Sequence, residues 1–352
     1  MAVLTVPHTR VRGIAACVPR NEESNYDYEL TSEKERKMFV KTTGIETRRV
    51  AEEGVTTADL CYQAAEQLIE ELQWDKQEID ALVFISQSGD YILPATGILL
   101  QDRLGLPKTT MAYDVNLGCS GYIYGMAQLG SLISTGGIRK ALMLVGDVST
   151  ATSSYRDKST YLLFGDAGTA TALEFDKDAS EMTFNLQSDG SGYDTIIIPE
   201  GGLRKFVSEE SFKYKDHGNG MVRNGIQVAL NGEKVFHFSM REVAPNIREL
   251  VENRLGKALD DFDYYVLHQA NMLMNNSIRR KLKLEKEKFP NSIQRYGNTS
   301  SASIPLTIVT QLHEQLQGDV KNIILSGFGV GLSWGSVNIH ADNLVIPKLL
   351  EV

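Results

Sequence analysis

The chain repeats its own pattern at an offset of about 180 residues. The apolar run 80–87 (Asp-Ala-Leu-Val-Phe-Ile-Ser-Gln) is matched by 263–270, and the run 141–146 is matched by 322–327. A Gly-Cys-Ser turn at 118–120 is matched by a Gly-Asn-Thr turn at 297–299. Three matches in the same order exceed what generic segments of α/β proteins produce by chance. We therefore interpret the chain as two similar halves.

The repeated runs indicate the class of fold. Each is short, continuously apolar and flanked by helical periodicity, which is typical of strands covered on both faces. No linker or low-complexity segment divides the chain. The sequence predicts an α/β protein of two halves packed face to face, residues 1–175 and 176–352, with a cap or loop region at about 190–230.

Composition excludes several classes of partner and site. The 352 residues carry a net charge of −9, which argues against a nucleic-acid partner. Three cysteines are too few and too scattered for a zinc site or a disulfide framework. No N-terminal signal pattern and no apolar run of membrane-spanning length is present. We expect a cytoplasmic protein with no membrane association and no metal.

Cys119 is the strongest candidate for a reactive residue. It follows a strand-like segment and precedes an apolar segment of helical periodicity. A thiol at a helix start feels the positive end of the helix dipole, so we expect a lowered thiol pKa. Gly118 and Gly121 leave room for a substrate carbonyl. The alternative is that Cys119 is a small buried hydrophobic residue.

His268 and Asn298 are the candidate partners of this thiol. If a pseudo-twofold axis relates the halves, the turns at Cys119 and Asn298 face one another, and His268 projects from a strand end into the same space. Asn298 could instead serve only as a helix N-cap. A thiol, an imidazole and an amide together suit thioester chemistry, because the thiol attacks and the other two stabilise an oxyanion.

Six motifs in order resemble one family. The resemblance to β-ketoacyl-acyl-carrier-protein synthase III runs from about residue 11 to residue 339. It implies the thiolase fold, a five-layered α-β-α-β-α sandwich of two five-stranded halves, usually in a homodimer. The motifs that carry it are Asn116–Gly121, Phe164–Ala170, Asn231–Phe236, His268–Asn271, Tyr296–Ser300 and Phe328–Gly335.

The resemblance implies a decarboxylating Claisen condensation. Cys119 would take the acyl group from an acyl-CoA substrate, and the oxyanion would be held by backbone N–H groups of Cys119 and of Gly329, Val330 or Gly331. Val330 replaces the middle glycine of the family's glycine run. No metal or redox cofactor is implied.

The second half-reaction would use the other two residues. A malonyl thioester on acyl carrier protein loses its carboxylate, and the negative charge moves to the thioester oxygen. The resemblance implies that neutral His268, through its N–H, and Asn298, through its amide, stabilise this enolate. The carbanion then attacks the acyl-cysteine to give 3-oxoacyl-acyl carrier protein, the initiation step of fatty-acid synthesis.

Five further positions follow by counting from the motifs. Leu93 stands where the family reaches from the partner subunit into the acyl pocket. Asn271 lies in the His-Gln-Ala-Asn motif and is expected to bind substrate. The chain departs from the family at three CoA positions, where Met38 replaces a tryptophan, and Lys158 and Leu273 replace arginines.

A basic run, Arg279, Arg280 and Lys281, stands out in this acidic chain. The family places its carrier-protein docking surface near this run, whereas the simple interpretation is a solvated helix face. The apolar loop around Leu93 and the strand at 111–115 are expected to meet a twofold mate, because both would otherwise leave apolar or unpaired groups exposed.

Other functions remain compatible with the residues. A condensing enzyme or acyltransferase of a specialised pathway could use an unusual acyl donor, and chalcone-synthase-like enzymes use the same three residue types. A papain-like cysteine hydrolase also orders Cys, His and Asn along the chain, although the local sequence around its nucleophile differs. A subunit without catalytic activity is the non-enzymatic alternative.

Overall fold

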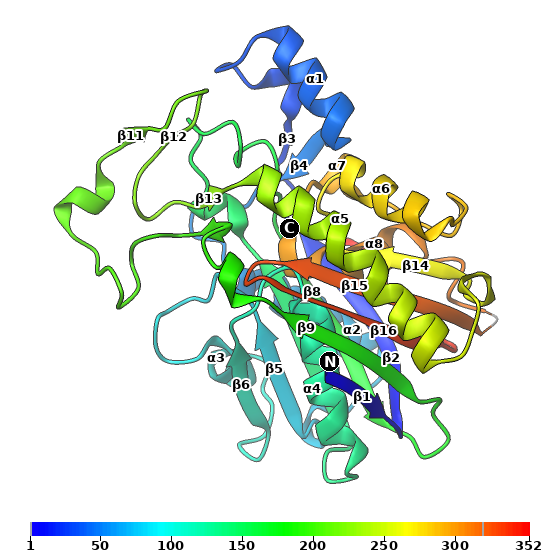
Figure 1. The fold of residues 1–352 in the computed structure, drawn as a ribbon. Helices are drawn as coiled ribbons and strands as arrows, with labels where there is room; N and C mark the ends of the chain where they lie inside the picture. Colours follow the sequence, from blue (N-terminus) through cyan, green and yellow to red (C-terminus); the bar gives the residue numbers. More distant parts are fainter. Residues whose placement is uncertain (1, 319) are drawn as a thin grey trace.

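Two sheets form the frame of the protein in the computed structural model, which describes residues 2–318 and 320–352. Figure 1 shows them crossing the centre of the molecule. The first sheet has the order β17 (Leu350–Glu351), β2 (Thr9–Val18), β8 (Ala167–Phe175), β7 (Lys140–Asp147), β5 (Ala81–Ile85) and β6 (Met111–Val115). The second has the order β1 (Ala2–Val6), β9 (Met182–Ser188), β16 (Ser333–Ala341), β15 (Lys321–Gly329) and β14 (Tyr264–Leu267).

The duplication is visible in the strand pairing. β5 pairs in parallel with β7, with Ala81 opposite Ala141, and β14 pairs in parallel with β15, with Tyr264 opposite Ile323. Each of the two longer strands then pairs antiparallel with its next neighbour, β7 with β8 and β15 with β16. The repeated runs of the sequence therefore occupy equivalent places in the two sheets.

The ends of the chain cross between the sheets. β1 pairs with β9 in the second sheet, and β17 pairs with β2 in the first, where Leu350 lies opposite Cys17. The first sheet consequently has six strands rather than the expected five. Each end fills an edge of the other half's sheet, so both halves share the two termini. The predicted division between residues 175 and 176 stays a prediction.

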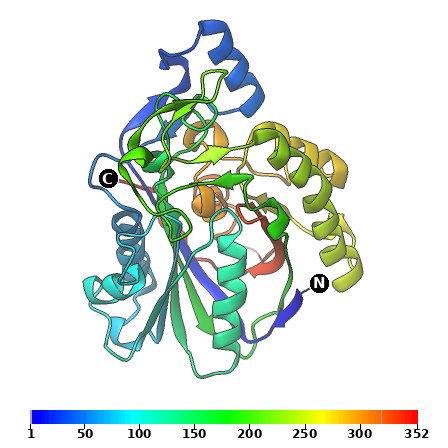
Figure 2. The ribbon, with the colours of Figure 1, turned by 60° about the vertical axis from the view of Figure 1, so that its left-hand side comes forward.

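Helices alternate with the sheets in five layers. α4 (Gly121–Ser134) and α8 (Ser303–Gln311) lie between the sheets, within a core cluster that includes residues of both. α2 (Thr57–Leu72) and α3 (Thr96–Arg103) cover the outer face of the first sheet, and α5 (Gly232–Arg248) and α6 (Met272–Leu282) cover that of the second. Figures 1 and 2 show α5 and α6 together on one side. The predicted α-β-α-β-α sandwich is confirmed.

Close packing fixes the height of α4. The helix carries no charged residue, and Tyr122, Ile123, Met126 and Leu129 are fully buried. At Gly125 an added Cβ would lie 1.9 Å from Cδ1 of Ile85 on β5, so only glycine lets the helix approach this strand. This contact fixes the distance between α4 and β5, and with it the position of Cys119, which lies two residues before the helix.

The remaining elements surround one end of the sandwich. α1 (Glu33–Thr43) projects at the top of Figure 1, and α7 (Ile293–Tyr296) lies beside β4 (Thr47–Arg49), which pairs with β3 (Glu22–Ser24). The region 190–230 contains two small antiparallel pairs. These join β10 (Ile196–Ile197) to β13 (Ala229–Leu230) and β11 (Lys215–Asp216) to β12 (Val222–Arg223).

Candidate active site

A cavity of about 570 Å³ opens where the central helices begin. Cys119, His268 and Asn298 all line it, although they come from three separate parts of the chain. All three side chains are almost completely removed from solvent, with 6%, 2% and 6% of their surface exposed. The rest of the wall is largely apolar, and its members include Phe39, Leu163, Phe164, Ile197, Val228, Leu230, Val235 and Met274.

Cys119 lies in the turn between β6 and α4, one residue before the N-cap Ser120. Burial raises the pKa of its thiol to about 11, which outweighs the hydrogen bonds to the sulfur that act in the opposite direction. The prediction of a lowered pKa was therefore wrong. The dipole argument considered only the helix, whereas the facing half of the protein excludes the water that would solvate a thiolate.

Hydrogen-bond donors nevertheless converge on this sulfur. The Val330 N–H points toward Sγ, and Oγ of Ser300 lies 3.9 Å from it. At Gly329 an added Cβ would come within 2.7 Å of Sγ, so the end of β15 packs directly against the nucleophile. An N–H so placed can stabilise negative charge on sulfur or on an oxygen bound beside it.

His268 follows the end of β14 and is held by a neighbouring hydroxyl. Its Nδ1 lies 2.7 Å from Oγ of Ser303, the first residue of α8, and its ring packs edge-on against Phe328 at 5.4 Å. Burial lowers the pKa of the imidazole from 6.5 to about 3. The ring is therefore neutral at physiological pH, and its other nitrogen, Nε2, is left for the cavity.

Asn298 is fixed through its backbone as well as its side chain. Its N–H donates to the Leu163 carbonyl and its carbonyl accepts from the Gly165 N–H, at 3.0 and 3.1 Å. Oδ1 accepts a 2.9 Å hydrogen bond from the Ser300 N–H. The side chain thus forms a local turn bond, as the capping alternative supposed, but this bond occupies only the oxygen. Both N–H groups of the amide stay available for a ligand oxygen.

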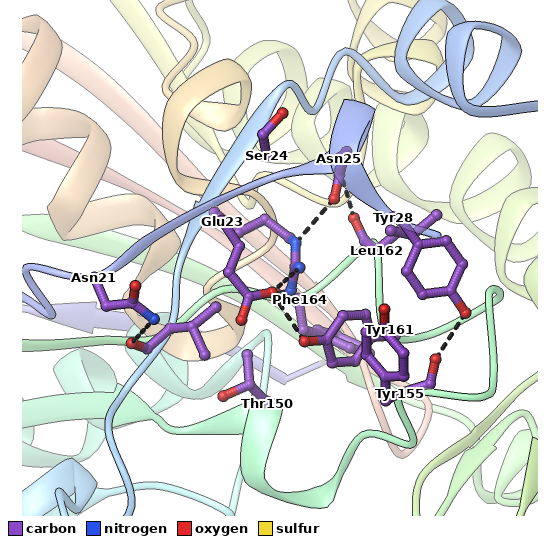
Figure 3. Close-up of polar contacts among 12 residues, drawn as sticks. Asn21, Glu23, Ser24, Asn25, Tyr28, Thr150, Tyr155, Tyr161, Leu162 and Phe164 are labelled. Carbon is purple, nitrogen blue, oxygen red and sulfur yellow. Dashed lines mark hydrogen bonds and ion pairs between the residues drawn. The ribbon is translucent and has the colours of Figure 1, made fainter. Parts of the chain in front are cut away.

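A buried arginine clamps the segment that holds Asn298. Arg48, whose side chain is 1% exposed, donates from Nη1 to the Phe164 carbonyl, from Nε to Asn25 and from Nη2 to Glu23. The Tyr161 hydroxyl donates to the same Glu23 carboxylate. Figure 3 shows Glu23, Asn25, Tyr161 and Phe164 grouped in this network. Its charge-assisted bonds lock the strand-like contact between Phe164 and Asn298.

A buried carboxylate joins the two halves beside the cavity. Asp147, at the end of β7, accepts from the Gln87 N–H at 2.8 Å and from the Ser301 hydroxyl at 2.7 Å. Burial raises the pKa of Asp147, while these hydrogen bonds lower it. Because Gln87 follows β5 and Ser301 follows Asn298, this carboxylate ties the turn that carries Asn298 to the first sheet.

The residues predicted to contact substrate fall in different places. Asn271 lines the cavity, where its side chain also caps α6 by accepting from the Met274 N–H. Met38 and Leu273 are 57% and 45% exposed and lie outside the cavity wall. Lys158 also lies outside it and pairs with Glu35 of α1 at 3.0 Å. Leu93 is 80% exposed.

The basic run forms the last turn of α6. Nη1 of Arg279 donates to the Leu284 carbonyl, and Nζ of Lys281 donates to the Met240 carbonyl at 2.5 Å, so both are occupied within the chain. The Arg280 side chain is exposed and has no hydrogen-bond or ion-pair partner in the part of the chain that the structure describes. Arg280 is therefore the cation of this run that faces solvent freely.

Sequence reasoning missed four residues of the site. Ser300 and Ser303 lie in the small-residue run after Asn298, whose polar character was the signal available. Asp147 ends a buried strand, where an acidic residue is unusual and invites a search for partners. Phe328 lies in a motif that was recognised for its glycines only. Ser300 and Asp147 make contacts between the two halves, whereas Ser303 and Phe328 contact His268 within the second half. No local pattern reports either kind of contact.

Residues 2–318 and 320–352 contain no cluster of three or more histidine, cysteine, aspartate or glutamate side chains suited to a metal ion. None of their helices is long and apolar enough to cross a membrane.

Comparisons with known proteins point to one family. The family models for 3-oxoacyl-acyl-carrier-protein (ACP) synthase III and for its C-terminal region match residues 113–190 and 253–341. The β-ketoacyl-acyl-carrier-protein synthase III of Staphylococcus saprophyticus is 32% identical over 335 residues, which cover 94% of this chain and 98% of the relative. The enzyme of that name from Geobacillus kaustophilus is 30% identical over 93% of this chain and 97% of its own length.

A solved structure gives the same result in three dimensions. The 3-oxoacyl-(acyl-carrier protein) synthase from Burkholderia xenovorans LB400 superposes with a TM-score of 0.93 at 35% identity, covering 100% of this chain and 99% of that one. The fold expected from the sequence motifs is therefore confirmed as the thiolase fold.

The low pKa of His268 predicts a pH effect on stability. Between about pH 3 and pH 6.5 the unfolded chain binds a proton at this ring that the folded protein does not, so acid favours unfolding. We expect His268→Gln to remove this term. Denaturant unfolding across pH 4–6 should then show a stability gain with rising pH that is smaller than wild type by about 1.4 kcal/mol per pH unit. Parallel curves for the two proteins would contradict a buried neutral ring.

Proposed function

The chain belongs to the 3-oxoacyl-acyl-carrier-protein synthase III family, and from that membership we propose which of its residues perform the reaction. It is an acyltransferase of the condensing type. It joins the acyl group of an acyl-CoA to the two-carbon unit of malonyl-acyl carrier protein, releasing CO₂ and forming 3-oxoacyl-acyl carrier protein at the start of fatty-acid synthesis. The observation that carries the residue assignment is the convergence of Cys119, His268 and Asn298 on one buried cavity.

Cys119 is the proposed nucleophile of the first half-reaction. The sulfur attacks the thioester carbonyl, its proton leaves with the CoA thiol, and the acyl group stays on Cys119. Because the thiol is the favoured form at neutral pH, charge must be stabilised as it develops. The Val330 N–H and the Ser300 hydroxyl are placed to stabilise negative charge at the sulfur. The Val330 N–H and the Cys119 N–H are the two proposed donors to the tetrahedral oxyanion.

His268 and Asn298 are the proposed stabilisers of the second half-reaction. When the malonyl carboxylate leaves as CO₂, its electron pair moves into the thioester and places charge on the carbonyl oxygen. Asn298 presents free amide N–H groups because its oxygen is bound by Ser300. The low pKa of His268 keeps the imidazole neutral. A neutral ring can donate an N–H hydrogen bond to the enolate oxygen without placing a full positive charge in the buried site.

The acylation step gives the direct test of this function. We expect wild-type protein incubated with acyl-CoA to gain one acyl mass in intact-mass spectrometry, and Cys119→Ser to gain none while remaining folded. Cys61→Ala is the matched control, because Cys61 is also fully buried but lies on α2, away from the cavity. An adduct on Cys119→Ser would exclude Cys119 as nucleophile. Turnover of peptides without an acyl-enzyme would favour a cysteine hydrolase.

Docking of the carrier protein is proposed at the end of α6. A carrier protein with an acidic surface would be electrostatically complementary to this basic run, of which Arg280 is the solvent-facing cation. Arg279 and Lys281 are bound to carbonyls and help to shape the surface. Asn271, at the opposite end of the same helix, lines the cavity.

We expect Arg280→Glu to raise the apparent KM for malonyl-acyl carrier protein by roughly tenfold at low salt, since a reversed charge repels an acidic partner. The salt dependence of KM should become flatter. Lys177→Glu carries the same charge change at an exposed position after β8 and serves as the control. Equal KM values for the two variants would show that the basic run is only a solvated helix face.

A homodimer is proposed from two unsatisfied features near the cavity. β6 is an edge strand of the first sheet, so one row of its backbone groups lacks a partner strand. The nearby loop exposes Tyr91, Ile92 and Leu93, at 65%, 96% and 80%. A twofold axis beside β6 would pair the strand with its mate and cover the apolar loop, which could then reach the partner's cavity. The three free cysteines suit a reducing compartment, and we propose the cytoplasm.

Leu93→Ala tests whether the partner shapes the acyl pocket. We expect the variant to stay dimeric by light scattering and to shift its preference among acyl-CoA donors toward longer or bulkier groups, because a side chain is removed from the pocket end. Leu30→Ala, at an exposed leucine before α1, is the control and should leave the preference unchanged. A fully active monomer at micromolar concentration would overturn the proposal.

A further inference from the structure

The hydroxyl of Ser303 is at the centre of a small buried network behind His268. Its oxygen lies 2.7 Å from Nδ1 of His268 and 2.9 Å from the Ser300 carbonyl oxygen, and it accepts from the Gln269 N–H at 3.3 Å. Ser303 and His268 are 1% and 2% exposed, so the network has little access to bulk water. Two of these three neighbours compete for the single hydroxyl proton.

Proton counting links the hydroxyl to the tautomer of the ring. A carbonyl can only accept, and the Gln269 N–H can only donate, so the Ser303 proton goes either to the Ser300 carbonyl or to Nδ1. If it goes to the carbonyl, Nδ1 must carry a hydrogen and donate to Ser303, and Nε2 is a bare lone pair. If it goes to Nδ1, that atom is an acceptor, and the ring hydrogen is on Nε2.

The first arrangement satisfies all three contacts at once. In the second, the oxygens of Ser303 and Ser300 face each other at 2.9 Å without a hydrogen between them. The Ser300 carbonyl still accepts from the Ser303 backbone N–H, so it keeps one hydrogen bond in both arrangements. The second arrangement is therefore less favourable than the first by about one hydrogen bond.

The proposed function requires the less favourable arrangement. Because Nδ1 is occupied by Ser303, only a hydrogen on Nε2 can reach an enolate oxygen in the cavity. We propose that Ser303 is a positioning residue that sets the tautomer of His268. Its hydroxyl donates to the Ser300 carbonyl in the free enzyme. It turns to donate to Nδ1 when a malonyl thioester oxygen accepts a hydrogen bond from Nε2. This inference rests on the assignment of His268 to the enolate.

The switch moves protons without changing their number. As Ser303 turns, one proton leaves Nδ1 during a transient opening of the buried network and one is taken up at Nε2 from water in the cavity, so the ring is neutral before and after the exchange. The new hydrogen bond from Nε2 to a developing enolate is charge-assisted, and such bonds are about twice as strong as neutral ones. That gain offsets the lost contact between Ser303 and the Ser300 carbonyl. The free enzyme thus rests in the acceptor form, and the substrate selects the donor form.

Nitrogen NMR reads the tautomer directly. In protein labelled with ¹⁵N-histidine, the ring signals of His268 are assigned by their absence in His268→Gln. We expect the free enzyme to carry the hydrogen on Nδ1. Addition of a malonyl-pantetheine amide, which resists decarboxylation, should move the hydrogen to Nε2. A hydrogen on the same nitrogen in both samples would overturn the switch.

Kinetics test whether Ser303 controls it. Ser303→Ala leaves Nδ1 without its hydroxyl partner in the donor form, so we expect malonyl decarboxylation to fall by roughly tenfold, the worth of one hydrogen bond. Acylation of Cys119 should change little, and KM for the malonyl substrate should hold. Ser303→Thr restores a hydroxyl and should recover decarboxylation.

The outcomes distinguish a failure of this inference from a failure of the proposed function on which it rests. Equal losses in both half-reactions of Ser303→Ala, or no recovery in Ser303→Thr, would show a purely structural role and overturn the inference. A wild-type protein that gains no acyl mass would instead defeat the proposed function. The NMR measurement on wild type does not depend on a Ser303 variant and decides the resting tautomer in either case.

Discussion

Helices α4 and α8 pack between the two sheets, and this buried central layer positions every group of the site. The turns that precede these helices carry Cys119 and Asn298, and both turns line the same cavity at one end of the sandwich. Glycine at position 125 lets α4 approach β5, and glycine at position 327 lets β15 pass within reach of the Cys119 carbonyl. Without this close packing the two halves could not enclose a common cavity.

The same burial sets the electrostatics of the site. Water is excluded from Cys119 and His268, so a thiol and a neutral imidazole are the stable forms. Charge appears only during reaction, first near the sulfur and then on an enolate oxygen. Fixed N–H and hydroxyl donors around a dry cavity stabilise such charge more strongly than water would, because they need no reorganisation.

A second set of buried polar groups keeps those donors in place. Arg48 fixes the segment paired with Asn298, Asp147 ties the following turn to the first sheet, and Ser303 holds the ring of His268. Two of these groups are charged, and both have their charge satisfied by several hydrogen bonds, as the cost of burying a charge requires. The side chains of His268 and Asn298 are thus oriented by the buried polar residues around them.

The sequence alone determined the duplicated α/β sandwich, because apolar runs and helical periodicity record which faces are buried. It also placed Cys119 and Asn298 in glycine turns before helices and His268 at a strand end, since strand ends and glycine turns leave local patterns. Only the tertiary structure decided the pKa of Cys119, the crossing of β1 and β17, and the contacts of Arg48, Asp147 and Ser303. Those depend on desolvation and on contact partners that are distant along the chain, several of them in the opposite half, and neighbouring residues along the chain carry no record of either.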